Sequence, residues 1–406
     1  MNNGQVDISE LSAISEQSQT GTRVPAVRLF LVFSRLGLTA FGGPAMVAYI
    51  RDLAVKKKRW LSQETFKDGM ALCQSIPGAT AMQTAAYVGL RAGGPLGALA
   101  AFVGFGLPAF ALMVGLSAAY QAGRDLQAVL AAFHGLRVIV IAIVVNATVG
   151  FGRSSIKNGR DAIIAASAAA FLVFHGSPIV AIVASAALSI LLYQGVNLPT
   201  KTSITDSPDT GWQTLALAGM LALLVAAGLA VLYLLERRLF DLATLMLKVD
   251  IFAFGGGFAS VPLMLHEVVN VHHWLDSRTF MDGIALGQVT PGPIVITATF
   301  VGYQVAGAPG AVVGTIGIFT PSVLMVLVMA PYFDRLQHSL WFRRAIRGVL
   351  ASFVGLLVAV AINFGLATSW SIPAVVLALA AFAPLRLKVD ILWVVLVGAA
   401  VSTLFL

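Results

Sequence analysis

Four clusters of glycine and proline interrupt the apolar stretches of this 406-residue chain. Both residue types weaken or break a helix. A helix that restarts after a break exposes backbone N–H groups without an intrahelical acceptor and the positive end of its dipole, and together these bind anions. The clusters therefore predict an anion site built from unpaired backbone amides. Its predicted members are Gly42, Gly43, Pro44, Pro77, Gly78, Gly255, Gly256, Gly257, Pro291 and Gly292.

Polar side chains flank the two proline breaks. Gln74 and Gln288 each stand three residues before a proline, and Thr80 and Thr290 adjoin the breaks. Amide and hydroxyl groups donate hydrogen bonds to oxyanions. We therefore place these four side chains in the predicted substrate-binding set.

Two basic residues, Arg35 and Lys248, each lie seven residues before the first glycine of a glycine break. A cation inside an apolar segment is costly and marks a functional site. We therefore predict that both side chains bind the anion. The alternative is that they lie near segment ends and extend to lipid headgroups.

The composition is that of a polytopic membrane protein. The chain is 58% hydrophobic and 11% charged, against about 25% charged residues in a soluble domain. Uncharged stretches such as 95–120 and 213–235 reach the roughly 20 residues that cross a bilayer. The net charge of +8 is interpreted as loop lysine and arginine that orient the chain in the lipid bilayer, and not as a nucleic-acid site. Residues 1–26 are predicted to form a disordered cytoplasmic tail.

The chain is also an internal duplication. Residues 60–78 and 274–292 are identical at 11 of 19 aligned positions. The likeness extends over a first repeat at 27–195 and a second at 240–406, and the linker at 196–239 holds one extra transmembrane helix. Duplications of this size are common in secondary transporters.

Each repeat holds six apolar segments, and the breaks interrupt the first two of each. The segments are about 27–50, 66–91, 95–120, 128–152, 161–175 and 177–195, then 240–265, 280–306, 309–332, 345–366, 371–385 and 389–406.

The distribution of basic residues among the loops favours re-entrant hairpins at the broken segments. With hairpins, most loop lysines and arginines share the N-terminal, cytoplasmic side, whereas six full spans place the basic loop 51–67 outside. Breaks are tolerated in a membrane where the backbone is buried or lines a cavity. A simple proline kink is the alternative. Either arrangement predicts an all-α polytopic membrane protein with two inverted structural repeats and broken or re-entrant helices.

Four further ionisable residues are candidates for coupling transport to ion movement. Asp68 aligns with Asp282, and His134 aligns with Arg347. The alternatives are a carboxylate that answers the helix dipole for the aspartates and a position at the membrane boundary for His134 and Arg347.

We expect no metal, no cofactor and no enzymatic activity. The single cysteine, Cys73, excludes an intrachain disulfide and a cysteine-based zinc cage. The cluster of His266, His272 and His273 with Glu267 is interpreted as a solvated loop, because adjacent histidines cannot share a helix face. No nucleophile elbow, paired-acid metal motif or helical zinc motif is present in the sequence.

The break motifs together resemble those of the chromate transporter family. They run from Phe41-Gly42-Gly43-Pro44 through Gln74-Ser75-Ile76-Pro77-Gly78, and from Phe254-Gly255-Gly256-Gly257 through Gln288-Val289-Thr290-Pro291-Gly292-Pro293. The length resembles that of the long-chain members, with two oppositely oriented halves. The resemblance implies efflux of chromate across the bacterial inner membrane, driven by the membrane potential or a proton gradient, and chromate resistance.

Several alternatives stay open at this stage. The substrate could be sulfate, which has the charge and shape of chromate, or another anion. Broken helices and repeats also serve passive channels, and a membrane enzyme that acts on a lipid is a third reading. The sequence does not settle whether protons take part or whether the chain forms a homodimer.

Overall fold

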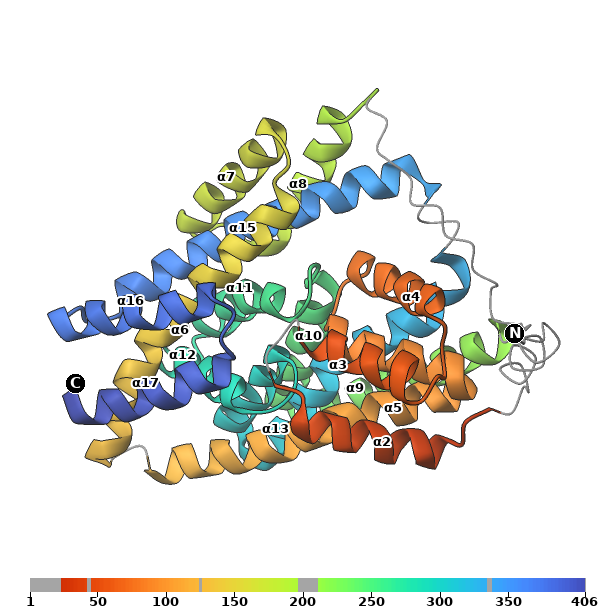
Figure 1. The fold of residues 1–406 in the computed structure, drawn as a ribbon, viewed down its shortest axis with the longest axis horizontal. Coiled ribbons are helices and arrows are strands. Elements are labelled where there is room, and N and C mark those ends of the chain that lie inside the picture. The colour runs from red at the N-terminus through yellow and green to blue at the C-terminus, as the bar shows by residue number, and fades with distance from the viewer. Residues whose placement is uncertain (1–22, 42–44, 124–125, 196–210, 334–337, 406) are drawn as a thin grey trace, which may run out of the picture.

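The computed structural model describes residues 23–41, 45–123, 126–195, 211–333 and 338–405. All regular elements in these ranges are helical, which confirms the predicted all-α fold (Figure 1). Gly42, Gly43 and Pro44, the first predicted break, lie outside the described residues.

Corresponding elements follow one another in the two repeats. The first repeat contains α2 (Ala26–Thr39), α3 (Ala45–Arg51), the π-helical η2 (Asp52–Lys57), α4 (Gln63–Ser75), α5 (Thr80–Gly123), α6 (Gln127–Ser155), α7 (Gly159–Val173) and α8 (Pro178–Leu192). The second contains α10 (Arg237–Phe252), η3 (Gly257–Ala259), α11 (Ser260–Leu265), the π-helical η4 (His266–Val271), α12 (Ser277–Val289), η5 (Ile294–Ile296), α13 (Thr297–Met329), η6 (Ala330–Tyr332), α15 (Leu340–Ala367), α16 (Ile372–Arg386) and α17 (Ile391–Phe405). The extra helix α9 (Gly211–Leu235) lies between them.

The chain doubles back at each glycine break. The rings of Phe33 and Trp60, on either side of the first break, are stacked with centroids 6.5 Å apart. In the second repeat, Lys248 Nζ lies 2.5 Å from Glu267 Oε1, across the break at 253–256. Residues 19 positions apart would be separated by about 28 Å in a continuous helix. The described segments on either side of each glycine break therefore pack back against one another.

The proline breaks are hairpin tips as well. A Cβ on Gly69 in α4 would collide with the ring of Tyr87 in α5, and a Cβ on Gly283 in α12 would collide with the ring of Phe300 in α13. Helices on either side of each break thus pack face to face. The described arms of these segments therefore pack as hairpins, as the re-entrant arrangement predicts, and not as simple kinks.

The long helices α5 and α13 each contain a sharp reversal. Backbone angles are non-helical at Gly94 in α5 and at Ala306 and Gly307 in α13. A Cβ on Gly89 would collide with the carbonyl group of Gly97, although eight residues span about 12 Å in a straight helix. The short first arm of α5 therefore belongs to the re-entrant hairpin, and its long second arm, residues 95–123, is the segment long enough to cross a bilayer.

The two repeats are interlocked. Helices α7 and α8 pack on α15 of the other repeat, and α16 and α17 pack on α6, as seen in Figure 1. Two serines at equivalent positions of the repeats form hydrogen bonds across these contacts. Ser402 Oγ accepts from the Gly135 amide, and Ser189 Oγ donates to the Arg344 carbonyl. Small residues and polar contacts of this kind hold helices together in lipid.

Apolar helices supply the outer surface. Five helices among the described residues are long and apolar enough to cross a membrane, which identifies a multi-pass membrane protein. Helix α9 keeps Leu223, Leu224 and Leu234 exposed and packs on α10 and α13. If the broken segments are re-entrant and the first repeat crosses the bilayer an even number of times, we predict that α9 starts the second repeat on the opposite side.

We predict that residues 51–66 face the cytoplasm and residues 266–281 face the outside, because the basic loops then lie inside. Lys57 and His272 are exposed at the corresponding hairpin ends. In a Cys73→Ala background, an impermeant thiol reagent added to intact cells should label His272→Cys and should reach Lys57→Cys only after permeabilisation. Labelling of position 57 in intact cells would contradict this orientation.

Candidate functional site

The tips of the hairpins meet at the centre of the molecule and bond to one another. The Gly78 amide donates to the Ala253 carbonyl at 2.9 Å, and the Gly292 amide donates to the Ala40 carbonyl at 3.0 Å. These two hydrogen bonds are related by the internal duplication, and each joins a proline break of one repeat to a glycine break of the other. The junction is therefore held together by the backbone of both halves.

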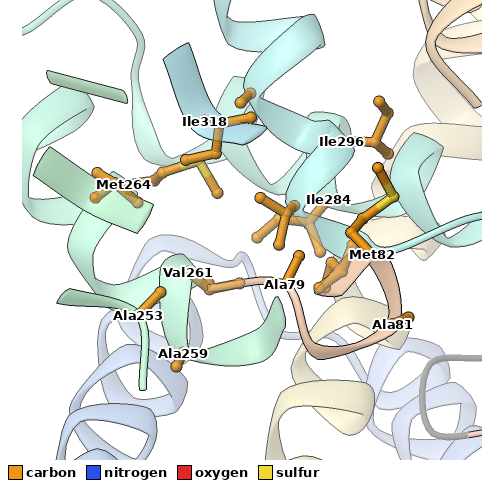
Figure 2. Packing of buried hydrophobic residues seen from close by; sticks show 14 of the residues in the cluster. Ala79, Ala81, Met82, Ala253, Ala259, Val261, Met264, Ile284, Ile296 and Ile318 are labelled. Carbon is orange, nitrogen blue, oxygen red and sulfur yellow. The ribbon is translucent and has the colours of Figure 1, made fainter. Parts of the chain in front are cut away.

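Apolar side chains from both repeats fill the space around this junction. Figure 2 shows Ala79 and Met82 of the first repeat close to Ala253, Val261 and Ile284 of the second, all of them buried. The hairpin tips are thus fixed in a packed core rather than left in a loop.

A cavity of about 850 Å³ lies against the junction. Its floor includes Ala79, Thr80 and Ala81 at the start of α5, Gly257 at the start of η3 and Ile294 at the start of η5. The first N–H groups of a helix have no intrahelical acceptor and carry the positive end of the dipole. The start of α5 and the starts of the two three-residue helices η3 and η5 therefore line one cavity, and α5 is the one long enough to carry a substantial helix dipole.

Gly256 and Thr80 face each other in this floor. A Cβ on Gly256 would lie 3.2 Å from Thr80 Oγ1. Gly255 and Gly256 both have φ of +96°, in the left-handed region that favours glycine. The break thus brings bare backbone from the second repeat next to a hydroxyl of the first.

The walls of the cavity are basic. The lining includes Arg51, Lys157, Arg343 and Arg347, and no aspartate or glutamate belongs to the lining within the described ranges. The Nε of Arg51 is buried and has no hydrogen-bond partner there. A cavity with basic walls and helix starts at its floor suits a small anion.

Part of the predicted site is brought together here. Gln74, Thr80, Gly255, Gly256, Gly257 and the coupling candidate Arg347 all line the cavity. Gln74 is exposed in it, whereas its equivalent, Gln288, is mostly covered and has a buried Nε2 without a partner.

Other predicted residues lie elsewhere. Thr290 is buried and its hydroxyl donates to the Gly287 carbonyl at 3.1 Å. Pro77 and Pro291 are buried at the hairpin tips. Arg35 is exposed, and Lys248 is held by Glu267, so neither side chain lines the cavity.

The prediction of unpaired amides at Gly78 and Gly292 is wrong. Both N–H groups are used in the hydrogen bonds between the two repeats. The reason is that a buried backbone donor needs a partner, and the facing break supplies a carbonyl group. The positive φ of these glycines, +120° and +121°, lets the chain make that bond.

The coupling candidates form ion pairs or lie apart. Asp282 accepts two hydrogen bonds at 2.7 Å from Arg137 and one at 2.9 Å from Tyr120. Arg347 donates in the same two-pronged way to Asp161, which also accepts from Tyr193. Both pairs join the two repeats and lock α6 to α12 and α15 to α7.

The remaining two candidates, His134 and Asp68, are both partly buried. His134 is partly buried, with an Nδ1 that has no partner among the described residues. Asp68 is partly buried on α4 and has an interaction partner.

Equivalent residues of the two repeats differ in exposure around the cavity. Ala48 and Gln74 are exposed and Arg51 and Met70 partly so, whereas their equivalents Val261, Met264 and Ile284 are buried and Gln288 is mostly covered. The open side carries Arg51, Lys157 and Arg343, which the predicted topology places in the cytoplasm. The two repeats therefore share a fold but differ in exposure.

Sequence reasoning missed Arg51, Lys157 and Arg343 because they stand at segment ends, where a basic residue is expected to orient the chain. Of the three, only Arg51 stands near a break in the sequence. Arg137 and Asp161, which complete the ion pairs, were not assigned a role because their partners are far away in sequence.

These features define a polytopic membrane transporter with two inverted repeats around a central cavity. A sequence profile of the chromate transporter family matches residues 27–190 and 240–403, so it covers both repeats. The chain belongs to this family.

The chain is similar in sequence to known relatives over most of its length. It is 43% identical over 382 residues, 94% of either chain, to an uncharacterized transporter of Methanocaldococcus jannaschii. It is 30% identical over 374 residues, 87% of this chain and 86% of the relative, to a chromate transport protein of Cupriavidus metallidurans. A chromate transport protein of Pseudomonas aeruginosa is also 30% identical, over 367 residues that cover 88% and 85% of the two chains. The chain matches no solved structure.

We predict that Gly256→Val weakens chromate binding at least tenfold, which corresponds to about 1.4 kcal/mol. The new side chain would fill the gap beside Thr80 and disfavour a φ of +96°. Calorimetry on the purified protein measures the binding. Gly219→Val in α9 is the control, since a Cβ there meets nothing within 4 Å; Gly195 is a poorer control because its φ is +77°. Parental affinity in Gly256→Val would show that the glycine serves packing alone.

Proposed function

We propose that this protein is a secondary active transporter that exports chromate from the cytoplasm across the bacterial inner membrane and so confers chromate resistance. The observation that carries the proposal is the basic cavity whose floor is formed by helix starts at the hairpin junction. Family membership and the two related chromate transport proteins support chromate as the substrate.

The proposed binding site combines backbone and side chains. The amides at the start of α5, the hydroxyl of Thr80 and the bare backbone of Gly255 and Gly256 contact the oxyanion. Gln74 adds an amide donor from α4. A dianion that leaves water needs several donors to replace its hydration, and helix starts supply donors that no pH change removes.

The basic residues of the walls guide the anion to this floor. Arg51 is the best candidate for direct contact, because its Nε is buried without a partner. Arg347 is held by Asp161 and is better suited to supporting the wall. Arg35 and Lys248, expected from the sequence to bind the anion, are left out because they do not line the cavity.

Transport follows from the inverted symmetry. The exposed side of the cavity and its covered counterpart are built from equivalent residues of the two repeats. If each repeat adopted the conformation that the other has here, the covered side would open and the exposed side would close. This is the alternating access expected of inverted repeats. A transporter of this kind releases its substrate unchanged, so no enzymatic step is part of the proposal.

Sulfate is the second candidate substrate. It is a tetrahedral dianion like chromate, and helix starts recognise charge and shape rather than the central atom. A passive channel would need a continuous path, whereas the equivalent positions on the far side are buried in this conformation.

Uptake of labelled chromate by inverted vesicles tests the proposal. Wild-type vesicles should accumulate chromate when the interior is made positive, and excess sulfate should reveal any competition. We expect Arg51→Ala to lower uptake at low chromate at least tenfold, because the cavity loses a cation whose Nε has no hydrogen-bond partner, although its terminal nitrogen contacts Asp52 at 3.5 Å. Arg35→Ala, which removes an exposed cation outside the cavity, should retain most uptake.

Two results would contradict these expectations. Vesicles that accumulate no chromate despite good expression would exclude chromate export. A loss in Arg35→Ala together with normal uptake in Arg51→Ala would place the anion outside this cavity.

A further inference from the structure

A buried polar cluster adjoins the hairpin junction at Gly78. Asp250 in α10, Ser322 in α13 and Gln83 in α5 are all fully buried. One polar atom of each lies within 3.3 Å of the position that a Cβ on Gly78 would occupy. Three polar side chains from separate helices therefore meet at one hairpin tip.

Two oxygen atoms in this cluster lack a donor. Ser322 Oγ donates to Asp250 Oδ2 at 2.7 Å, and Gln83 Nε2 donates to the Pro77 carbonyl. Asp250 Oδ1 and Gln83 Oε1 are buried and have no hydrogen-bond partner among the described residues. Both atoms can only accept hydrogen bonds when the carboxyl group is ionised. A bound proton or cation would satisfy them, and the cluster itself supplies neither.

Within the described ranges, no cation forms an ion pair with Asp250. Lys248 on the same helix pairs with Glu267 of η4, and α13 and α5 present Ser322 and Gln83. The other ionisable residues of those helices are Tyr303 on α13 and Tyr87, Arg91 and Tyr120 on α5, and none of them is among the groups that act on the Asp250 carboxyl group. An isolated buried carboxylate is costly and takes up a proton instead.

The internal duplication shows that the fold does not require this cluster. The positions equivalent to Asp250, Ser322 and Gln83 are Gly37, Ala109 and Ile296. A Cβ on Gly292, the equivalent of Gly78, would meet Ala109 Cβ. The second junction bond, from Gly292 to Ala40, thus forms in apolar surroundings. The polar cluster has a role other than building the junction.

Ser322 connects this cluster to the cavity. Its oxygen accepts from the Ala79 amide at 2.9 Å while its hydroxyl hydrogen goes to Asp250. Ala79 lines the cavity and precedes Thr80. The charge on Asp250 therefore acts directly on the first turn of α5, where the proposed anion site lies.

We propose that Asp250, with Ser322 and Gln83, is the proton-binding site of the transporter and that it is protonated when an anion occupies the cavity. A proton from water forms an O–H bond at Asp250 Oδ1, and the new donor can serve an acceptor such as Gln83 Oε1. A charged Asp250 would repel an oxyanion beside Thr80, whereas a neutral one would not. Anion and proton binding therefore reinforce each other, as linkage requires.

This inference rests on the proposed function, because it names the ion that accompanies the anion. A dianion carried out with one proton still moves one negative charge outward. A membrane potential that is negative inside favours that movement.

Proton uptake on anion binding is the test. Chromate is added to purified protein in weak buffer with a pH indicator. Wild type should take up about one proton per bound anion, and Asp250→Asn should take up none while still binding chromate. Asp241→Asn, on the same helix but 40% exposed, should behave as wild type. Uptake by Asp250→Asn equal to that of wild type would overturn the proposal.

Ser322→Ala is a second variant that tests the same proposal if Asp250→Asn fails to fold. Ala109 occupies the equivalent position, so alanine fits the junction. Loss of the Ser322 hydroxyl removes a donor that stabilises the carboxylate, so the pH midpoint of proton uptake should rise. An unchanged midpoint would contradict the assignment. Binding that requires sodium in wild type but not in Asp250→Asn would instead make the cluster a sodium site.

An infrared titration separates failure of this proposal from failure of the proposed function. As the pH is lowered, wild type should develop a protonated carboxylic acid band that Asp250→Asn lacks, and the band should appear at a higher pH when chromate is bound than when it is absent. If wild type binds neither chromate nor sulfate yet shows this band, the substrate assignment fails and the proton site stands. Identical spectra from the two proteins would remove the proton site.

Discussion

The backbone hydrogen bonds between facing hairpin tips are the interaction on which this structure depends. A chain that breaks its helices inside a membrane leaves amides and carbonyls without water to bind them. Here Gly78 bonds to Ala253 and Gly292 bonds to Ala40, so each repeat supplies the partner that the other lacks. Neither repeat could bury its breaks in this way alone. The same bonds place the start of α5 beside Gly256, and the cavity follows from that arrangement.

The internal duplication explains why the two halves share a fold. We relate the proposed function to the positions at which the two halves differ. The ion pairs Arg137–Asp282 and Arg347–Asp161 both join the repeats, yet they occupy non-equivalent positions. Exposure differs as well, because Gln74 faces the cavity while Gln288 is mostly covered. The polar cluster at Asp250 has only apolar equivalents. In our proposal, the two halves share a fold but contribute differently to the opening of the cavity, to anion binding and to proton binding.

The sequence predicted the features that repeat or break a pattern. The duplication, the four breaks and the re-entrant hairpins could be inferred from Gly255, Pro291 and their counterparts, because glycine and proline act locally. The contacts between halves could not be inferred. Gly78 was expected to keep a free amide, since its acceptor lies 175 residues away in the chain. Arg35 and Lys248 seemed central by alignment, but equivalent positions need not converge when each side chain faces outward. The comparison of the repeats did not point to Asp250, because the equivalent position in the first repeat is Gly37.

The position of bound chromate tests the central claim most directly. Chromium scatters X-rays anomalously, so a diffraction measurement on crystals grown with chromate would locate it without reference to any side chain. We predict one chromium peak in the cavity, beside Thr80 and Gly256 and within reach of Arg51. A peak next to Arg35 or Lys248, with the cavity floor empty, would contradict an anion site built from the hairpin junction.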